Sequence, residues 1–389
     1  MVAPPPKRSW SWRSQAFRGV VYQLLAVAAI ALALGYLMHN TLENMRVRGI
    51  KSGFDFIAQT AGFAIGESLI PFDSAESYGK AFVVGLSNTL RVAVVGIILA
   101  TLLGTVVGIA RLSRNLLVRS LATFYVELLR NVPLLLQLFI WYFVLTEMLP
   151  PLEEALHAGG LFFSKNGLQF PIPHWEAGHV GTLLGLAAGL VAAWLWRARA
   201  LRRFESSGEL PAVWLPGLAM ALGGMVLGWL AGGSPSGLDV PEKTEISVVG
   251  GGAVTPEFLT VLIGLTTYTA AYIAEVVRAG IQSVPYGQHE AAAALGLAPA
   301  QELRLVQLPQ ALRVIIPPLT SQYLNLTKNS SLAVAVGYPD LVSIANTSLN
   351  QTGRAIECIA IVMACYLTLS LATSGFMNWY NRRAAIRER

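Results

Sequence analysis

Ionisable residues inside otherwise apolar runs are the first candidates for chemistry in this chain. Glu275 and Arg278 lie three positions apart in such a run, so on a helix they share one face. Charged groups in this setting either pair with each other or face a cavity, where a carboxylate binds ammonium groups and a guanidinium binds carboxylates. The spacing favours an internal salt bridge, and the cavity interpretation stays open beside it.

A polar stripe interrupts another apolar run, 315–337. Asn325 and Lys328 share one helical face, and Gln322, Asn325 and Asn329 form a neighbouring stripe. Lys328 fits a packing or gating role as well as a path for a polar solute. Glu127 and Arg130 repeat the three-residue spacing, and for them a structural pair is favoured.

Side chains typical of metal or catalytic centres do not cluster in the sequence. We therefore expect no catalytic residue and no metal site. The two cysteines, Cys358 and Cys365, lie on one face of one apolar run and are expected to be buried thiols. The histidines are scattered: His39, His157, His174, His179 and His289.

The composition places these residues in a membrane protein. Hydrophobic residues make up 54% of the 389 residues and charged residues 13%, with a mean hydropathy of +0.54. Soluble domains carry about 25% charged residues. A helix needs roughly 20 apolar residues to cross a bilayer. Val20–Met38 meets this requirement without a charge, and we expect it to be a retained span rather than a signal peptide.

The apolar runs predict an all-α polytopic protein of about eight transmembrane helices. Lipid admits only helices and closed barrels, and these runs do not alternate with a period of two. The third run contains Pro133, so an interfacial turn before Leu134 is expected there. The predicted spans are 19–39, 84–110, 120–148, 179–197, 211–232, 255–281, 315–337 and 355–380.

Basic residues are distributed unevenly between the loops, and cytoplasmic loops carry an excess of Lys and Arg. With a cytoplasmic N-terminus, seventeen basic residues lie on the cytoplasmic side and seven outside, which predicts that both termini are cytoplasmic. The cytoplasmic set is Lys7, Arg8, Arg13, Arg18, Arg111, Arg114, Arg119, Arg197, Arg199, Arg202, Arg203, Arg304, Arg313, Arg382, Arg383, Arg387 and Arg389. The outer set is Arg46, Arg48, Lys51, Lys80, Lys165, Lys243 and Arg354. This asymmetry also explains the net charge of +6 without nucleic acid as a partner.

The loop between the sixth and seventh predicted spans, 284–309, carries the most specific pattern. Its Ala-rich stretch from Glu290 to Leu295 has high helix propensity, and Gly296 can end this helix in a left-handed conformation. Pro299 suits the first turn of a second helix, which Pro309 is expected to end. A compact helix pair of this kind predicts a docking surface for another protein.

This loop resembles the EAA loop of ABC importer permeases. The resemblance rests on Glu290-Ala291-Ala292, Gly296 and Leu308-Pro309, with the proline 19 positions after the glutamate. It implies that the loop docks on a separate ATPase subunit and couples to it. The residues that it implies for coupling are Glu290, Ala291, Ala292, Gly296, Leu297 and Pro309.

Further blocks resemble the polar amino-acid branch of these permeases. They are 85–90, 125–137, 271–285 and the Lys328-Asn-Ser-Ser-Leu stretch, where Ser330 departs mildly from the usual threonine. Gly53-Phe-Asp-Phe-Ile57 and 61–63 look like the general L-amino-acid subgroup, whose members are long at the N-terminus. A substrate path is expected, without a choice among amino acids, at Glu275, Arg278, Asn325, Lys328, Asn329 and Ser330.

The resemblance also implies an organisation of the chain in five parts. Residues 1–83 would form a cytoplasmic tail, the first span and a periplasmic loop, and 84–148 the first part of the permease core. Residues 149–254 would add a periplasmic loop and two extra spans. The second part of the core, 255–380, would contain the coupling loop, and 381–389 would be a basic cytoplasmic tail.

The implied assembly is a type I ABC importer in a bacterial inner membrane. It would contain this chain, a second and different permease, two ATPase subunits and a periplasmic amino-acid-binding protein, surrounded by membrane lipid. No phosphate-binding loop is recognisable, since Lys80, the one lysine after a glycine, lacks the flanking residues of that motif. ATP and magnesium are therefore expected on the partner ATPase. Two alternatives are a secondary transporter driven by an ion gradient, which would leave 284–309 unexplained, and a membrane enzyme.

Overall fold

The computed structural model describes residues 12, 14–47, 49, 52–176, 178–207, 214–234, 236–244 and 248–384. Within these residues the chain divides into two compact units, 1–130 with 265–389, and 131–264. Seven of the basic residues used for orientation lie outside the described residues: Lys7, Arg8, Arg13, Arg48, Lys51, Arg387 and Arg389.

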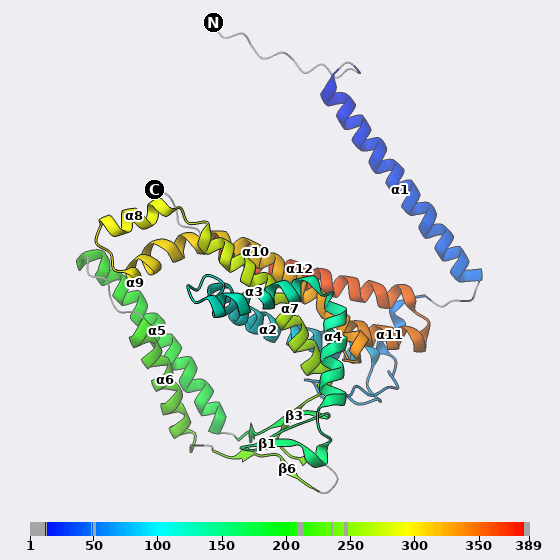
Figure 1. Cartoon of the computed structure of the whole chain (residues 1–389). Helices are drawn as coiled ribbons and strands as arrows, with labels where there is room; N and C mark the ends of the chain where they lie inside the picture. The colour runs from blue at the N-terminus through cyan, green and yellow to red at the C-terminus, as the bar shows by residue number, and fades with distance from the viewer. Residues whose placement is uncertain are drawn as a thin grey trace. The chain divides into compact units, whose positions relative to one another are not determined.

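The first unit is built from helices (Figure 1). Its longest elements are α1, α2 and α12, each long enough to cross a bilayer. The α-helices are α1 (Gln15–Val47), α2 (Tyr78–Ala110), α3 (Leu116–Asn131), α8 (Tyr286–Ala294), α9 (Pro299–Glu302), α10 (Leu308–Asn329), α11 (Leu341–Thr352) and α12 (Ala355–Ala384). Shorter helical segments are η1 (Phe54–Ala58), η4 (Leu303–Gln307) and η5 (Ser330–Val336), and the second half of α7 (Pro256–Gln282) belongs to this unit.

The second unit combines helices with short antiparallel strands. Its helices are α4 (Leu134–Phe143), η2 (Val144–Met148), η3 (Leu152–Glu154), α5 (Gly178–Ser207), α6 (Trp214–Ala231) and the start of α7. A four-stranded sheet has the order β1 (Leu156–Ala158), β2 (Leu161–Ser164), β3 (Gly167–Phe170), β8 (Gly252–Val254). Two ribbons pair β4 (Ile172–Pro173) with β5 (Leu238–Asp239) and β6 (Glu242–Lys243) with β7 (Val248–Val249). These strands were not anticipated, because two to four residues show no clear alternation.

The predicted helical, multi-pass fold is confirmed. Among the described residues, six helices are long and apolar enough to span a membrane, or seven if α3 and α4 form one broken span. The break falls at Val132–Pro133, where the sequence predicts a turn. The seventh predicted span, 315–337, is helical as α10 and η5, but its polar residues exclude it from the spans recognised by composition.

Close contact at glycines holds neighbouring helices together. A Cβ added to Gly104 or Gly108 of α2 would lie 2.7 to 2.8 Å from α7, against Ile273 and the carbonyl oxygens of Ala270 and Ala274. Small residues four positions apart let transmembrane helices approach to backbone contact. The spacing of Gly104 and Gly108 therefore fixes α2 against α7.

The residue types of the 85–90 block are explained by its contacts with α11. This helix was not predicted from the sequence. Gly85 packs against Leu341 of α11, and Thr89 Oγ1 accepts a hydrogen bond from Leu341 N at 3.1 Å. Asn88 Nδ2 donates to the Pro339 carbonyl at 2.9 Å, and buried Asp340 caps α11 by accepting from Ser343 N. Asn88 and Thr89 of this block therefore satisfy backbone groups at the start of α11, whereas Ser87 donates to the Val83 carbonyl within α2.

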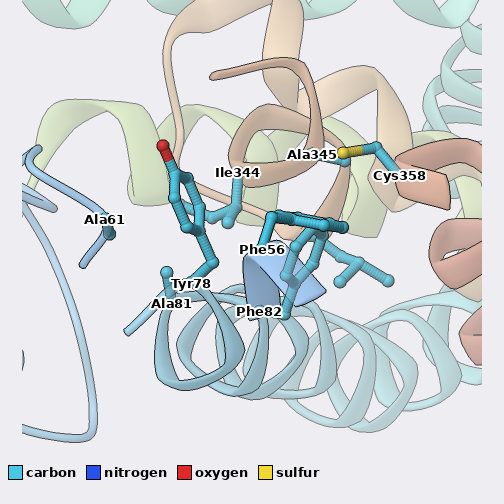
Figure 2. Packing of buried hydrophobic residues seen from close by; sticks show 9 residues of the cluster. Phe56, Ala61, Tyr78, Ala81, Phe82, Ile344, Ala345 and Cys358 are labelled. Carbon is cyan, nitrogen blue, oxygen red and sulfur yellow. The ribbon is translucent and has the colours of Figure 1, made fainter. Parts of the chain in front are cut away.

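The Gly53–Ile57 block has an equally local explanation. Phe56 of η1 lies in a buried cluster with Tyr78 and Phe82 of α2 and Ile344 of α11 (Figure 2). The Phe56 ring meets the Tyr78 ring edge to face, with centroids 5.7 Å apart. Cys358 belongs to the same cluster and is 1% exposed, which confirms a buried thiol at this position.

A buried arginine ties the same segment to α12. Arg354 Nη2 lies 3.0 Å from an Asp55 carboxylate oxygen, and its Nη1 donates to the Gly53 carbonyl at 2.9 Å. Gly53 N donates to Glu357 Oε1 at 2.6 Å. The segment 53–55 is thus attached through both its backbone and its side chain.

In the second unit, α5 and α6 lie side by side as an antiparallel hairpin (Figure 1). Gly181, Gly185 and Gly189 of α5 face Gly224 and Gly228 of α6 and Gly232, which directly follows α6. A Cβ at Gly228 would lie 2.2 Å from the Gly181 carbonyl oxygen, so no side chain fits between the two backbones. The remaining surface of α6 and of residues 178–196 of α5 is mostly exposed and apolar, as expected where lipid surrounds them.

We predict that Gly228→Leu separates α5 from α6 and lowers stability by at least about 3 kcal/mol, because overpacking here meets backbone rather than flexible side chains. The measurement is the midpoint of thermal unfolding of the full chain in detergent. Gly223→Leu is the matched control on the same helix, since nothing lies within 4 Å of its Cβ position. An equal loss in both variants would contradict the close contact.

Candidate functional site

The first half of the 284–309 hairpin is a short helix that ends at a left-handed glycine. α8 stops at Ala294, and Gly296 has a φ of +71°. The Gly296 N–H donates to the Ala293 carbonyl at 2.9 Å, and the Leu297 N–H to the Ala292 carbonyl at 3.1 Å. These two bonds form a Schellman motif, so the predicted role of Gly296 as a helix stop is confirmed.

The second half differs from the prediction at Pro309. Pro299 begins α9 as expected, but η4 then continues as a π-helical segment, and Pro309 lies in the first turn of α10. The prediction that Pro309 ends the second helix is therefore wrong. A proline lacks an N–H but is tolerated in the first turn of a helix. Pro309 therefore lies where π-helical hydrogen bonding changes to α-helical, and it does not end the helix.

Most of α8 is exposed, including residues expected to contact an ATPase. Glu290, Ala291 and Gly296 are exposed, Leu297 and Pro309 are half-buried, and Ala292 is 2% exposed. Tyr286 and Leu295 were not singled out from the sequence, although they are 71% and 79% exposed. Large apolar side chains at both ends of a short exposed helix mark a surface that can bury them against a partner.

A buried carboxylate links the two halves of the hairpin. Glu302 is 5% exposed, and its Oε1 lies 2.5 Å from His289 Nδ1 and 2.5 Å from Gln307 Nε2. An ionised carboxylate only accepts, so both partners donate. The hydrogen bond from His289, with that from Gln307, holds the pKa of Glu302 below its usual value despite burial.

Four charged residues form a cluster where α2, α3 and α7 meet. The predicted Glu275–Arg278 pair is confirmed, with 2.5 Å between Glu275 Oε1 and Arg278 Nη2. Arg111 also binds Glu275 and lies 3.9 Å from Glu127. Arg111 was counted only as a loop charge in the sequence. Its place directly after the apolar run 84–110 is the signal that it could fold back on the membrane helices.

Arg130 and Tyr125 of α3 contact α7 close by. Arg130 lies over the Tyr272 ring, 5.2 Å from its centroid, within reach of a cation–π interaction. Tyr125 donates to the Thr267 carbonyl at 2.8 Å. Between them Val126 is buried against α7. The 125–137 block therefore begins with a face that packs on α7.

The predicted path residues on α10 and η5 occupy another place. Asn325 and Lys328 are exposed, Asn329 is half-buried, and Ser330 is 1% exposed. Lys328 lines a pocket of about 320 Å³ with Ser331, Val342, Val362 and Tyr366.

The charged cluster and this pocket are separated along the helices. Gly280 of α7 packs against Ile315 of α10, and Glu275 lies within two turns of Gly280. Lys328 lies more than three turns beyond Ile315. The structure thus divides the predicted path residues between two locations.

The family described as "Binding-protein-dependent transport system inner membrane component" matches residues 94–386. The chain belongs to this family. The permease is 46% identical over 395 residues to the putative amino-acid ABC transporter permease protein YhdX of Escherichia coli K12, covering 98% of each chain. It is 45% identical to the general L-amino acid transport system permease protein AapQ of Rhizobium johnstonii, covering 98% of this chain and 96% of that one.

A third relative is the glutamate/glutamine/aspartate/asparagine transport system permease protein BztB of Rhodobacter capsulatus. The permease is 40% identical to it, over 96% of this chain and 95% of that protein. The predicted resemblance to ABC permeases, and to their amino-acid branch, is confirmed by the family and by these relatives. With its apolar helices, the permease is a multi-pass membrane protein.

We predict that Arg111→Ala costs about 3 kcal/mol of stability, because it removes a buried cation that faces two carboxylates. Arg278→Ala should cost less than about 1 kcal/mol, since its side chain is 30% exposed and Glu275 keeps Arg111. Thermal unfolding of both variants in detergent tests this order. A larger loss for Arg278→Ala would contradict the central place of Arg111.

Proposed function

We propose that the permease is the transmembrane subunit of an ATP-driven importer that moves L-amino acids across the bacterial inner membrane. The observation that carries the proposal is the exposed hairpin α8–α9, closed by the left-handed Gly296. A short helix that buries little within its own chain gains most of its stability from a partner. A separate ATPase subunit, carrying ATP and magnesium, is the partner proposed here.

Amino acids are proposed as substrates on the strength of the relatives. YhdX, AapQ and BztB are all named for amino-acid transport, and they span nearly the whole chain. An ion-gradient-driven transporter is the weaker candidate, because it gives the hairpin no role.

The coupling surface is proposed to consist of Glu290, Ala291, Gly296, Leu297 and Pro309. Ala292, expected there from the sequence, is 2% exposed and instead packs α8 against the permease itself. The exposed alanine and glycine allow close approach of another chain, and the exposed Leu295 and Tyr286 add apolar area at its margins. ATP binding would bring two ATPases together and displace this surface. The transport path would then change from inward-facing to outward-facing.

A second permease, two ATPase subunits and a periplasmic binding protein complete the proposed assembly. The two permeases are proposed to be different chains, as the general amino-acid resemblance implies. Both termini are proposed to be cytoplasmic from the excess of basic residues on that side.

The substrate path is proposed to pass the pocket beside Lys328, with Asn325, Asn329 and Ser330 on the same segment. An ammonium group at this pocket can bind a substrate carboxylate. Glu275 and Arg278 are proposed to contribute to the path only by fixing the helices, because Glu275 is already paired with both Arg278 and Arg111.

We predict that Gly296→Leu abolishes copurification with the ATPase or uncouples ATP hydrolysis from amino-acid uptake. No atom lies within 4 Å of its Cβ position, so the effect comes from the backbone. A left-handed φ costs a non-glycine residue about 1–2 kcal/mol, which opens the turn after α8. Uptake and hydrolysis are measured together in proteoliposomes that contain the whole transporter.

Gly287→Ala is the matched control, because Gly287 has equally free space but lies within α8 at a helical φ. This change should leave coupling intact, and Gly296→Asn should be intermediate, since asparagine tolerates the left-handed region. The proposal would be contradicted if Gly296→Leu still took up amino acids, without ATP and driven by an ion gradient.

A further inference from the structure

The position of α8 depends on few contacts within the permease. Ala292 is the one buried residue that α8 contributes. One exposed hydrogen bond, from Gln310 Nε2 to Gln288 Oε1 at 3.1 Å, connects α8 to α10. Exposed hydrogen bonds between flexible side chains contribute little. Another interaction is needed to hold α8 in one place while a partner displaces it.

The buried carboxylate of Glu302 is placed to provide that interaction. Its Oε1 accepts hydrogen bonds from His289 Nδ1 of α8 and from Gln307 Nε2 at the end of η4, both at 2.5 Å. Charge-assisted hydrogen bonds of this kind are about twice as strong as neutral ones. Because Glu302 is 5% exposed, water competes little for the carboxylate. We call these three residues the hairpin latch.

The π-helical segment makes the latch possible. In an α-helix, a residue five positions on lies about 140° around the axis, away from the first residue. The wider turn of the π segment Leu303–Gln307 brings Gln307 back over Glu302. The Leu308 N–H donates to the Leu303 carbonyl, which completes this widened turn directly before α10. The latch therefore joins α8 to the end of η4, which continues directly into α10.

We propose that Glu302 is a positioning residue that holds α8 and the start of α10 together as one rigid lever. This inference rests on the proposed coupling of the hairpin to an ATPase. With the latch closed, a displacement of α8 moves α10, which carries Lys328 at its other end. With the latch open, α8 moves alone: the turn at Gly296 bends, and α10 does not follow.

The first test needs the permease alone. Hydrogen exchange of the α8 amides is compared in wild type, Glu302→Ala and Glu302→Gln. We expect exchange to rise about tenfold in Glu302→Ala and less in Glu302→Gln, whose amide oxygen still accepts but carries no charge. Gln288→Ala is the matched control, because it removes the exposed link to α10 and should stay close to wild type.

The second test measures ATP hydrolysed per amino acid transported by the whole transporter. Glu302→Ala should keep the ATPase bound but raise this ratio at least about twofold, which a purely structural residue would not do without loss of assembly. The exchanged pair His289→Glu with Glu302→His should restore part of the coupling. Glu302→Gln serves as the informative variant if Glu302→Ala does not fold.

The outcomes separate the latch from the proposed function. A wild-type permease that binds no ATPase would end the proposed function, whatever the exchange of α8. Wild-type coupling with unchanged exchange in Glu302→Ala would overturn the latch alone. Faster exchange with an unchanged ratio would also overturn it, because α8 would then be held loosely without consequence for coupling.

Discussion

Close approach of helices at small residues is the constraint on which this structure depends. Lipid is as apolar as the helix surfaces, so burial of apolar area gives helices little reason to associate within a membrane. Contact instead requires that backbones come near enough to pack in detail, which Gly104 and Gly108 allow between α2 and α7. Polar side chains then act at defined points, as Thr89 does at the start of α11 and Arg111 in the charged cluster.

These polar contacts fix the helices that connect the membrane region to the hairpin. The charged cluster fixes the last turns of α7, and α7 ends directly before α8 begins. The hairpin begins after α7, which the charged cluster fixes, and ends at α10. Both ends of the hairpin are therefore held, while most of α8 between them is exposed. The proposed docking role of α8 requires this combination, because a displacement of α8 would not reach α10 if the ends of the hairpin were mobile.

Much of this arrangement could be read from the sequence. Apolar runs locate the membrane helices, since length and composition alone decide whether a segment can span lipid. Their ends are less accurate, because α1 and α5 continue eight and ten residues beyond the predicted spans. Gly296 and Pro299 are equally readable, because each has a backbone preference that does not depend on distant residues. The π-helical turn before Pro309 could not be predicted, because no local residue preference marks it and the contact that it allows, between Glu302 and Gln307, is seen only in the structure. α11 and the role of Arg111 depend on residues far apart in the chain, which no local pattern reveals.

The glycine contacts between α5 and α6 have a consequence for how the chain enters the membrane. Both helices are apolar enough to span it, and their packing uses only their own backbones. Such a pair can insert during synthesis as a self-sufficient hairpin, before the helices that follow have left the ribosome. An insertion of this type adds two crossings and leaves the direction of every later crossing unchanged. A permease core can therefore acquire residues 178–231 without any change in the sidedness of the segments that follow them.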